Sequence, residues 1–166
     1  MIIVMMGVCG CGKSTVGEAL ASDLGWRFLD ADDFHPPQNV AKMAAGEALD
    51  DADRWPWLDR IARELARLLA EGGHAVLACS ALKQSYRDRL AAAGDVRFVH
   101  LAGDYDTIAA RLSSRRHRYM PASLLQSQFA TLERPDDALE VDVSDAVDVQ
   151  ARAIRAAYGL APAAAS

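Results

Sequence analysis

Residues 7–14 have the types and the spacing of a phosphate-binding loop. They read Gly-Val-Cys-Gly-Cys-Gly-Lys-Ser and match the P-loop pattern G-x-x-x-x-G-K-[ST]. Glycines let the backbone curl so that successive N–H groups point at one anion. In this pattern Lys13 reaches the β- and γ-phosphates of a nucleoside triphosphate, and Ser14 holds Mg²⁺. The predicted nucleotide-binding residues of the loop are Gly7, Val8, Cys9, Gly10, Cys11, Gly12, Lys13, Ser14 and Thr15.

Two carboxylates, Asp30 and Asp32, follow the short apolar segment 27–29. Because side chains alternate along a strand, we expect both carboxylates to point to the same side. If this strand neighbours the P-loop, Asp30 supports Mg²⁺ through water, and Asp32 accepts a proton from an attacking hydroxyl group. The alternative is that these acids only cap a helix that begins near Pro36, with Asp33 as the cap.

Basic and hydroxyl side chains further along the chain could bind an acidic, polyhydroxyl substrate. Ser80 ends an apolar segment, and Lys83 and Arg87 follow at helical i,i+4 spacing, which predicts one hydroxyl and two cations on one side. The alternative is a solvated helix surface with paired charges. The predicted substrate-binding residues are Asp32, His35, Lys42, Arg54, Ser80, Lys83 and Arg87.

Arginines gather at the start of the segment 113–131, where Arg111 and Arg115 are again at i,i+4 spacing and Arg116 and Arg118 follow. Phosphoryl transfer requires positive charge over the transferred oxygens and the exclusion of water, so we predict a lid that carries arginine. The alternative is a basic helix end that complements the helix dipole. The predicted catalytic residues are Lys13, Asp32 and Arg115.

The chain has three cysteines, an odd number without the spacing of a disulfide framework or of a zinc site. Cys9 and Cys11 lie inside the P-loop, where small side chains fit. One further hypothesis is that a thiol near Lys13 and a helix N-terminus is acidified and sensitive to oxidation.

These side chains need a frame that brings the ends of several strands together. Apolar segments alternate with helical patterns, which predicts the α/β class with a central five-stranded parallel sheet covered by helices on both faces. The P-loop is expected on a central strand, and Pro56, Asp104 and Ser144 are expected in the first turn or at the N-caps of helices. The predicted strands are 2–6, 27–29, 75–79, 96–101 and 139–143, and the helices are about 13–24, 55–71, 83–93, 104–115 and 145–158.

The length of 166 residues predicts one domain over 1–160, followed by a flexible tail at 161–166. Insertions at about 33–53 and 113–131 are expected to cover the substrate and to form the lid. A net charge of −5 gives no overall attraction to nucleic acid. No apolar segment is long enough for a membrane span, and no signal peptide is visible.

Together, these motifs resemble the gluconokinase family, small P-loop kinases related to shikimate and adenylate kinases. The resemblance implies a three-layer P-loop kinase fold with a short lid, ATP-dependent phosphorylation of D-gluconate to 6-phospho-D-gluconate, Mg²⁺, a cytoplasmic setting and a homodimer. By analogy with related kinases it also implies that Arg111 stacks on adenine and that Arg115 contacts phosphates. The segments that carry it are 6–15, 30–36 with Asn39, 42–43 with Gly46, 51–58, 78–83 with 86–87, and 124–133.

The sequence departs from the family pattern at two places. Cys9 and Cys11 stand where serine is usual, and His117-Arg118 stand where the lid usually has Gly-His. The alternatives are a kinase for another small hydroxy acid such as shikimate, a nucleotide kinase, and an ATP-binding module without catalysis. A GTP-dependent switch protein would need the motifs Asn-Lys-x-Asp and Asp-x-x-Gly, and the sequence contains neither.

Overall fold

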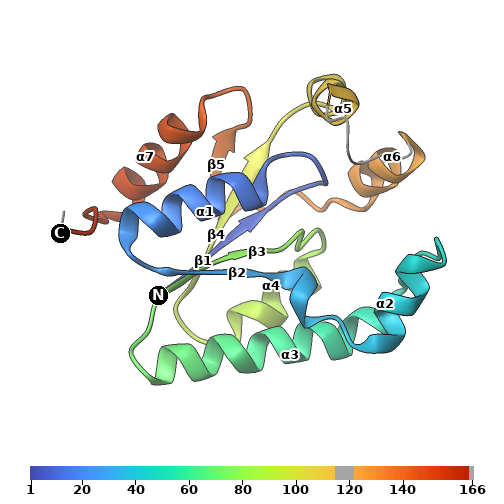
Figure 1. Cartoon of the computed structure of the whole chain (residues 1–166), viewed down its shortest axis with the longest axis horizontal. Coiled ribbons are helices and arrows are strands. Elements are labelled where there is room, and N and C mark those ends of the chain that lie inside the picture. The colour runs from blue at the N-terminus through green and yellow to red at the C-terminus, as the bar shows by residue number, and fades with distance from the viewer. Residues whose placement is uncertain (115–121, 165–166) are drawn as a thin grey trace.

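The structure is a computed structural model that describes residues 1–114 and 122–164. The five strands of these residues form one all-parallel sheet with the order β2-β3-β1-β4-β5 (Figure 1). Each strand lies within one residue of its predicted bounds, and β1, which leads into the P-loop, is central as predicted. The strands are β1 (Ile2–Met6), β2 (Arg27–Asp30), β3 (Ala75–Ala78), β4 (Val96–Ala102) and β5 (Leu139–Asp142).

Helices cover both faces of this sheet. The helices α1 and α7 lie together on one face, and α3 and α4 lie together on the other (Figure 1). Every side chain of β1 is therefore buried, because its two faces are both covered. The helices of the described residues are α1 (Lys13–Leu24), the 3-10 helix η1 (Ala31–Phe34), α2 (Pro37–Ala44), α3 (Asp51–Ala70), α4 (Gln84–Ala91), α5 (Tyr105–Ser114), α6 (Ala122–Thr131) and α7 (Val147–Tyr158).

The two predicted insertions contain helices of their own. The segment 33–53 contains α2, which begins where the alternative interpretation of the acidic residues expects a helix. The described part of 113–131 contains the end of α5 and the whole of α6. Of these two helices, only α5 is predicted from the sequence. The helices α2 and α6 of these insertions lie on the side of the molecule where the strands have their carboxyl ends (Figure 1). This is the edge at which ligands bind in open parallel sheets.

The longest helix begins four residues earlier than predicted. Asp50 accepts a hydrogen bond from Asp53 N at 2.8 Å, and the Asp53 carboxylate accepts one from Asp50 N at 3.1 Å. This capping box satisfies two main-chain donors at the start of α3. Pro56 consequently lies inside the helix and beyond its first turn, contrary to the prediction.

One of the predicted caps is confirmed. Asp104 Oδ1 accepts a hydrogen bond from Thr107 N at 2.7 Å at the start of α5. Ser144 is not the cap of α7, because that helix begins only at Val147. Asp33 is not a cap either, because it lies within η1, and among the described residues no side chain caps α2.

The C-terminal segment lies against the first helix. Residues 161–164, part of the predicted flexible tail, form neither helix nor strand. Ala163 N nevertheless donates to Asp23 O at 2.7 Å, near the end of α1, so this part of the segment is anchored. Residues 165–166 lie outside the described part of the chain. Within residues 1–114 and 122–164, no helix is long and apolar enough to cross a lipid bilayer.

Candidate active site

The P-loop runs from the end of β1 to the start of α1, and its path requires glycine at three positions, the first of which is Gly7 with φ 140°. Gly10 and Gly12 have φ values of 80° and 96°, which L side chains rarely adopt. A Cβ on Gly10 would also lie 2.7 Å from the side chain of Leu112 in α5. The glycine spacing recognised in the sequence therefore sets the observed backbone path of the loop.

Lys13, Ser14 and Thr15 form the first turn of α1, so the positive end of the helix dipole faces the loop. Ser14 and Thr15 are exposed to solvent. The Lys13 amine folds back over the loop and donates to Val8 O at 3.0 Å. In this state the lysine is bonded to a neutral main-chain oxygen, which a phosphate oxygen could replace.

The cysteine thiols of the loop are not acidified. Burial raises the pKa of the Cys9 thiol and also that of the buried Cys11, and in both cases the positive charge of Lys13 opposes the shift without reversing it. Burial likewise raises the pKa of the Cys79 thiol, to about 12. The hypothesis of an oxidation-sensitive thiolate in the P-loop is therefore not supported.

The structural connection of Asp30 and Asp32 to the P-loop differs from the predicted one. Strand β2 does not neighbour β1, because β3 lies between them. Even so, the positive charge of Lys13 acts on the Asp32 carboxyl, and the charges of Lys13, Asp30 and Asp32 all act on the Cys79 thiol at the end of β3. Asp30 pairs with the last residue of β3 in the sheet, and the first residue of the P-loop donates to the turn just after β3, so the loop and the acidic segment meet at the end of that strand.

Contrary to the prediction, Asp30 and Asp32 are not alternating residues of one strand. Strand β2 ends at Asp30, and Asp32 lies in η1, where its main-chain N–H donates to Asp30 Oδ1 at 3.0 Å. The pKa of the Asp32 carboxyl is raised by loss of hydration and by the negative charge of Asp30. Because the Asp32 side chain is 86% exposed, water offsets much of the first effect, and the charge of Asp30 is the more persistent cause.

His35 lies next to Asp32 and is held in a fixed orientation. Its ring stacks on Trp57 with the ring centres 4.4 Å apart. The Asn39 amide nitrogen, which can only donate, lies 3.3 Å from His35 Nδ1, so the ring proton of the neutral histidine belongs on Nε2. His35 Nε2 is 3.9 Å from Asp32 Oδ1. Burial lowers the pKa of His35, which favours this neutral form.

Arg54 and Lys83 come together through two residues that the sequence analysis did not assign. Lys83 Nζ lies 3.1 Å from both carboxylate oxygens of Asp51. The Tyr86 hydroxyl donates to Asp51, and Arg54 Nη1 donates to that hydroxyl at 3.2 Å. The Tyr86 and Lys83 bonds lower the pKa of Asp51. We call Asp51, Arg54, Lys83 and Tyr86 the acceptor cluster.

Lys42 binds the start of α3 instead of standing open to solvent. Its amine lies 3.0 and 2.8 Å from the two oxygens of Asp53, which is also a member of the capping box. Hydrogen bonding and the charge of Asp53 raise the pKa of Lys42. The structure therefore places Lys42 near the acceptor cluster, with its charge paired.

Arg87, a predicted substrate-binding residue, has a buried side chain whose donors are all bonded within the chain. It is 1% exposed. Its five N–H groups donate to the carbonyl oxygens of Ala81, Leu82 and Glu133 and, twice, to Gln84 Oε1. Ala81 has φ 44°, a strained value for a residue with a Cβ. Arg87 therefore holds the turn between β3 and α4, and it does not share an open side with Lys83.

Ser80, the third member of the predicted trio, lies in that turn next to the P-loop. Its carbonyl oxygen accepts a hydrogen bond from Gly7 N at 3.2 Å, and the residue is half-buried. The turn that Arg87 holds thus connects the start of the P-loop to Lys83. The P-loop and the acceptor cluster are thus both attached to the turn that Arg87 stabilises.

Arg111 reaches from α5 to the loop after β5, where its guanidinium donates to Val143 O. Its predicted contact with adenine is not tested by this arrangement. Arg115, Arg116, His117 and Arg118 lie outside the described residues.

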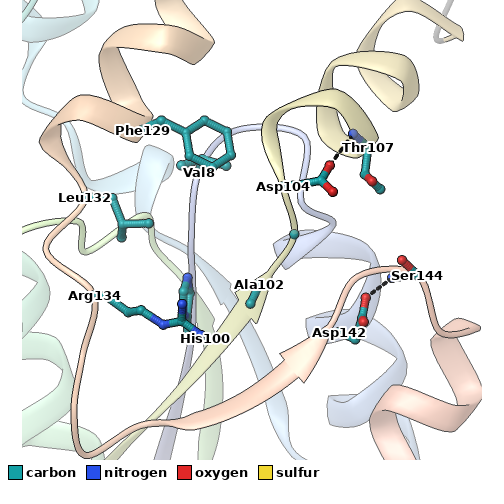
Figure 2. Close-up of a pocket in the computed structure, with 11 residues that line it drawn as sticks. Val8, His100, Ala102, Asp104, Thr107, Phe129, Leu132, Arg134, Asp142 and Ser144 are labelled. Carbon is teal, nitrogen blue, oxygen red and sulfur yellow. Dashed lines mark hydrogen bonds between the residues drawn. The ribbon is translucent and has the colours of Figure 1, made fainter.

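A cavity of about 470 Å³ lies between the carboxyl ends of β4 and β5 and the helices α5 and α6 (Figure 2). Asp104 and Asp142 line one side, and Phe129 and Leu132 close another. Of the predicted site residues that the structure describes, Val8 alone belongs to its wall. The cavity is therefore next to the P-loop but is not where Asp32 and the acceptor cluster meet it.

Three residues of these contacts were not predicted from the sequence: Asp51, Tyr86 and Gln128. The side-chain amide oxygen of Gln128 accepts a hydrogen bond from Cys9 N at 2.6 Å. A signal for two of them was present: Asp51 and Arg54, and Lys83 and Tyr86, are each three residues apart, a spacing that brings helical side chains together. No sequence pattern indicates the contact of Gln128, because its partner is 119 positions away.

Comparisons with known proteins agree on one family. The shikimate kinase family model matches residues 9–140. A gluconokinase of Gluconobacter oxydans is 50% identical over 139 residues, which cover 81% of this chain and 76% of the relative. The crystal structure of a gluconokinase from Sinorhizobium meliloti is 44% identical, with a TM-score of 0.82, and covers 90% of this chain and 86% of that one. A sugar kinase from Janibacter is 40% identical, with a TM-score of 0.89, and covers 99% and 98%.

The family model covers the P-loop from Cys9 onward, the acidic segment after β2 and the acceptor cluster, and the Janibacter structure covers 99% of the chain. They confirm the P-loop kinase fold, a kinase that uses a nucleotide, and the family expected from the sequence motifs. Since one family model covers most of the chain and curated gluconokinases reach 50% identity, the chain belongs to the gluconokinase family, within the wider group of kinases that includes shikimate kinase.

Proposed function

We propose that this kinase transfers the γ-phosphoryl group of ATP to the terminal hydroxyl of D-gluconate and releases 6-phospho-D-gluconate and ADP. The observation that carries the proposal is a row of polar side chains. It begins at Asp32, on whose carboxyl the charge of Lys13 acts, and His35 follows with its Nε2 3.9 Å from Asp32 Oδ1. The charge of Arg54, in α3, acts in turn on His35. From Arg54 it continues through Tyr86 and Asp51 to Lys83.

This row suits an extended sugar acid. Arg54 and Lys83 offer two cations for a carboxylate at the far end, and Tyr86 offers a hydroxyl. Asp32 lies at the near end, close to the lysine that faces the triphosphate. A six-carbon acid bound along the row would present its terminal hydroxyl to Asp32. His35, Lys42 and Ser80 complete the proposed acceptor site.

Asp32 is the proposed base. As the substrate oxygen forms its bond to the γ-phosphorus, the bond from that phosphorus to the bridging oxygen of ATP breaks, and the hydroxyl proton passes to Asp32. Lys13 places positive charge at the transferred group, and Arg115 is the proposed second cation. Positioning and charge neutralisation supply most of the rate in this class of reaction.

The donor set beside the P-loop fits Mg²⁺. Ser14 is exposed at the first turn of α1, and Asp30 has one oxygen engaged by Asp32 N and a second left for a ligand or water. Magnesium is usually held by one or two protein oxygens together with phosphates and water. Bound there, the ion would neutralise charge on the β- and γ-phosphates.

The remaining expectations also belong to the proposal. They are a single domain over 1–160, with the segment 33–53 over the substrate, the segment 113–131 as a lid, and Arg111 against adenine. A homodimer and a cytoplasmic setting are proposed on the family resemblance alone.

A coupled assay that measures ADP tests the substrate. Purified protein with ATP and Mg²⁺ is supplied in turn with gluconate, shikimate and nucleoside monophosphates. We expect a high rate with gluconate only. A higher kcat/KM with shikimate or a nucleotide would overturn the acceptor half of the proposal and leave the P-loop assignment intact.

The variant Arg54→Met tests the row itself. Loss of a charge-assisted bond to a carboxylate costs about 1.5–3 kcal/mol, so KM for gluconate should rise roughly 10- to 150-fold while KM for ATP stays within twofold. Arg60→Met is the matched control, because Arg60 is an exposed arginine of the same helix. An unchanged KM for gluconate in Arg54→Met would remove Arg54 from the site.

A further inference from the structure

Two helices contact the P-loop at two neighbouring residues, Cys9 and Gly10, which we call the crown of the loop. From α6, Gln128 Oε1 accepts a hydrogen bond from Cys9 N at 2.6 Å. From α5, the Leu112 side chain lies so close to Gly10 that an added Cβ would be 2.7 Å from it. The crown is thus held between α5 and α6.

The residues on either side of the crown are buried, but the Cys9 peptide has no main-chain partner among the described residues. Val8 is 2% exposed and lines the cavity of about 470 Å³ on the side of β4 and α6 (Figure 2). Within the loop itself, the Cys11 N to Val8 O bond is long, at 3.4 Å. Among the hydrogen bonds of the described residues, the one to Gln128 is the one that satisfies the Cys9 N–H.

Helix α6, in contrast, is well anchored. Leu125 of α6 is 2% exposed, and Glu133, two residues after the helix, donates its N–H to Leu82 O at 2.9 Å. The Glu133 carboxylate accepts from Gln84 N at 2.7 Å. Gln128 consequently connects the anchored end of α6 to the Cys9 peptide of the loop.

We infer that Gln128 is a positioning residue of the nucleotide site. It satisfies the Cys9 N–H and fixes the orientation of the crown peptide, so that the loop is preorganised before the triphosphate arrives. The inference deepens the proposed function by assigning a residue to nucleotide binding, but it does not depend on which acceptor is phosphorylated. No contact of Gln128 with the substrate is required.

The test compares Gln128→Met with Gln126→Met. Methionine has nearly the length and helix propensity of glutamine but no strong acceptor. Gln126 lies two residues earlier in α6 and is exposed, so its variant controls for the change of residue type. Each protein is measured for ATP affinity by calorimetry, for the KM of ATP and of gluconate, and for hydrogen exchange of the Cys9 amide by NMR.

We expect the Kd and KM for ATP to rise about three- to tenfold in Gln128→Met, as for loss of one partly buried hydrogen bond. The Cys9 amide should exchange faster, and KM for gluconate should stay within twofold. Gln126→Met should match the unmodified protein. Unchanged exchange of the Cys9 amide, or unchanged ATP affinity, in Gln128→Met would overturn the inference.

Two further outcomes keep the result decisive. If Gln128→Met fails to fold, Gln128→Asn, with the same amide on a shorter side chain, should show the same faster exchange and weaker ATP binding; normal values there would refute the inference. If the unmodified protein does not phosphorylate gluconate, calorimetry with ATP still tests Gln128, so failure of the proposed substrate is distinguished from failure of the positioning role.

Discussion

The nucleotide half and the acceptor half of the site are held ready by different kinds of partner. In the nucleotide half, Lys13 is bonded to a carbonyl oxygen and Cys9 N–H to an amide oxygen, both neutral. In the acceptor half, Lys42 and Lys83 are bonded to the carboxylates of Asp53 and Asp51. In each half, these donors are therefore already bonded to groups of the protein.

The difference has a consequence for binding. A phosphate oxygen competes with the neutral carbonyl oxygen of Val8 for the Lys13 amine, so its negative charge gives it an advantage there. A ligand at the acceptor cluster must compete with Asp51, which already carries a charge. The acceptor half should therefore reject neutral polyols and favour ligands that bring a carboxylate of their own.

The largest expected effect comes from removing the proposed base, Asp32, which lies between the two halves of the site. Asp32→Asn keeps the size of the side chain but cannot take up the hydroxyl proton, so kcat should fall about 10²- to 10⁴-fold. ATP affinity measured by calorimetry should stay within twofold. Asp33→Asn, a change at the exposed neighbouring acid, is the control. Near-normal turnover in Asp32→Asn would show that another group is the base.

The next largest effect concerns the turn that connects the halves. Arg87→Lys keeps the charge but replaces five donors with three, which leaves buried carbonyl oxygens without partners. The free energy of unfolding in urea should fall by about 2–4 kcal/mol. Arg89, like Arg87, lies in α4, and it forms a half-exposed pair with Asp59 of α3. Arg89→Lys should therefore change the free energy of unfolding by less than about 1 kcal/mol. Equal losses in the two variants would contradict the structural role of Arg87.

A smaller effect sharpens the contrast between neutral and charged partners. In Asp51→Asn the acceptor cluster loses its own anion, so inorganic sulfate should compete with gluconate more strongly, with an inhibition constant about threefold lower. Asp59 lies in α3 like Asp51 and is paired with Arg89, so Asp59→Asn should leave the inhibition constant of sulfate unchanged. If sulfate inhibits both variants and the unmodified protein equally, Asp51 is not an internal competitor.

The smallest expected effect is a shift in pH dependence. The raised pKa of Asp32 means that kcat/KM should fall on acidification at a higher pH than for an ordinary carboxyl. Asp30→Asn removes the neighbouring negative charge, so the pKa of Asp32 falls and this acid limb should move to lower pH. Asp33→Asn should move it in the same direction by less, because its charge acts more weakly on Asp32. If the acid limb does not move in Asp30→Asn, Asp32 is not the group that sets the pH dependence.

The strands and the P-loop were predictable because their signals are local. The strand positions follow from short apolar segments, and Gly10 and Gly12 determine a backbone path within eight residues. For the same reason the family could be inferred from the motifs before any fold was known. The nucleotide half depends mainly on main-chain geometry, which a sequence pattern specifies directly.

The order of the strands and the partners of the charged residues were decided by tertiary structure. Sequence could not show that β3 separates β2 from β1, nor that Asp32 belongs to η1. Helical spacing alone placed Arg87 beside Lys83, but burial turned it toward main-chain carbonyls. Asp51 meets Tyr86 and Gln128 meets Cys9 only because distant helices pack together. The types of reactive group were thus set by the sequence, whereas their pairing depended on packing, because long side chains bond to whatever the fold brings within reach.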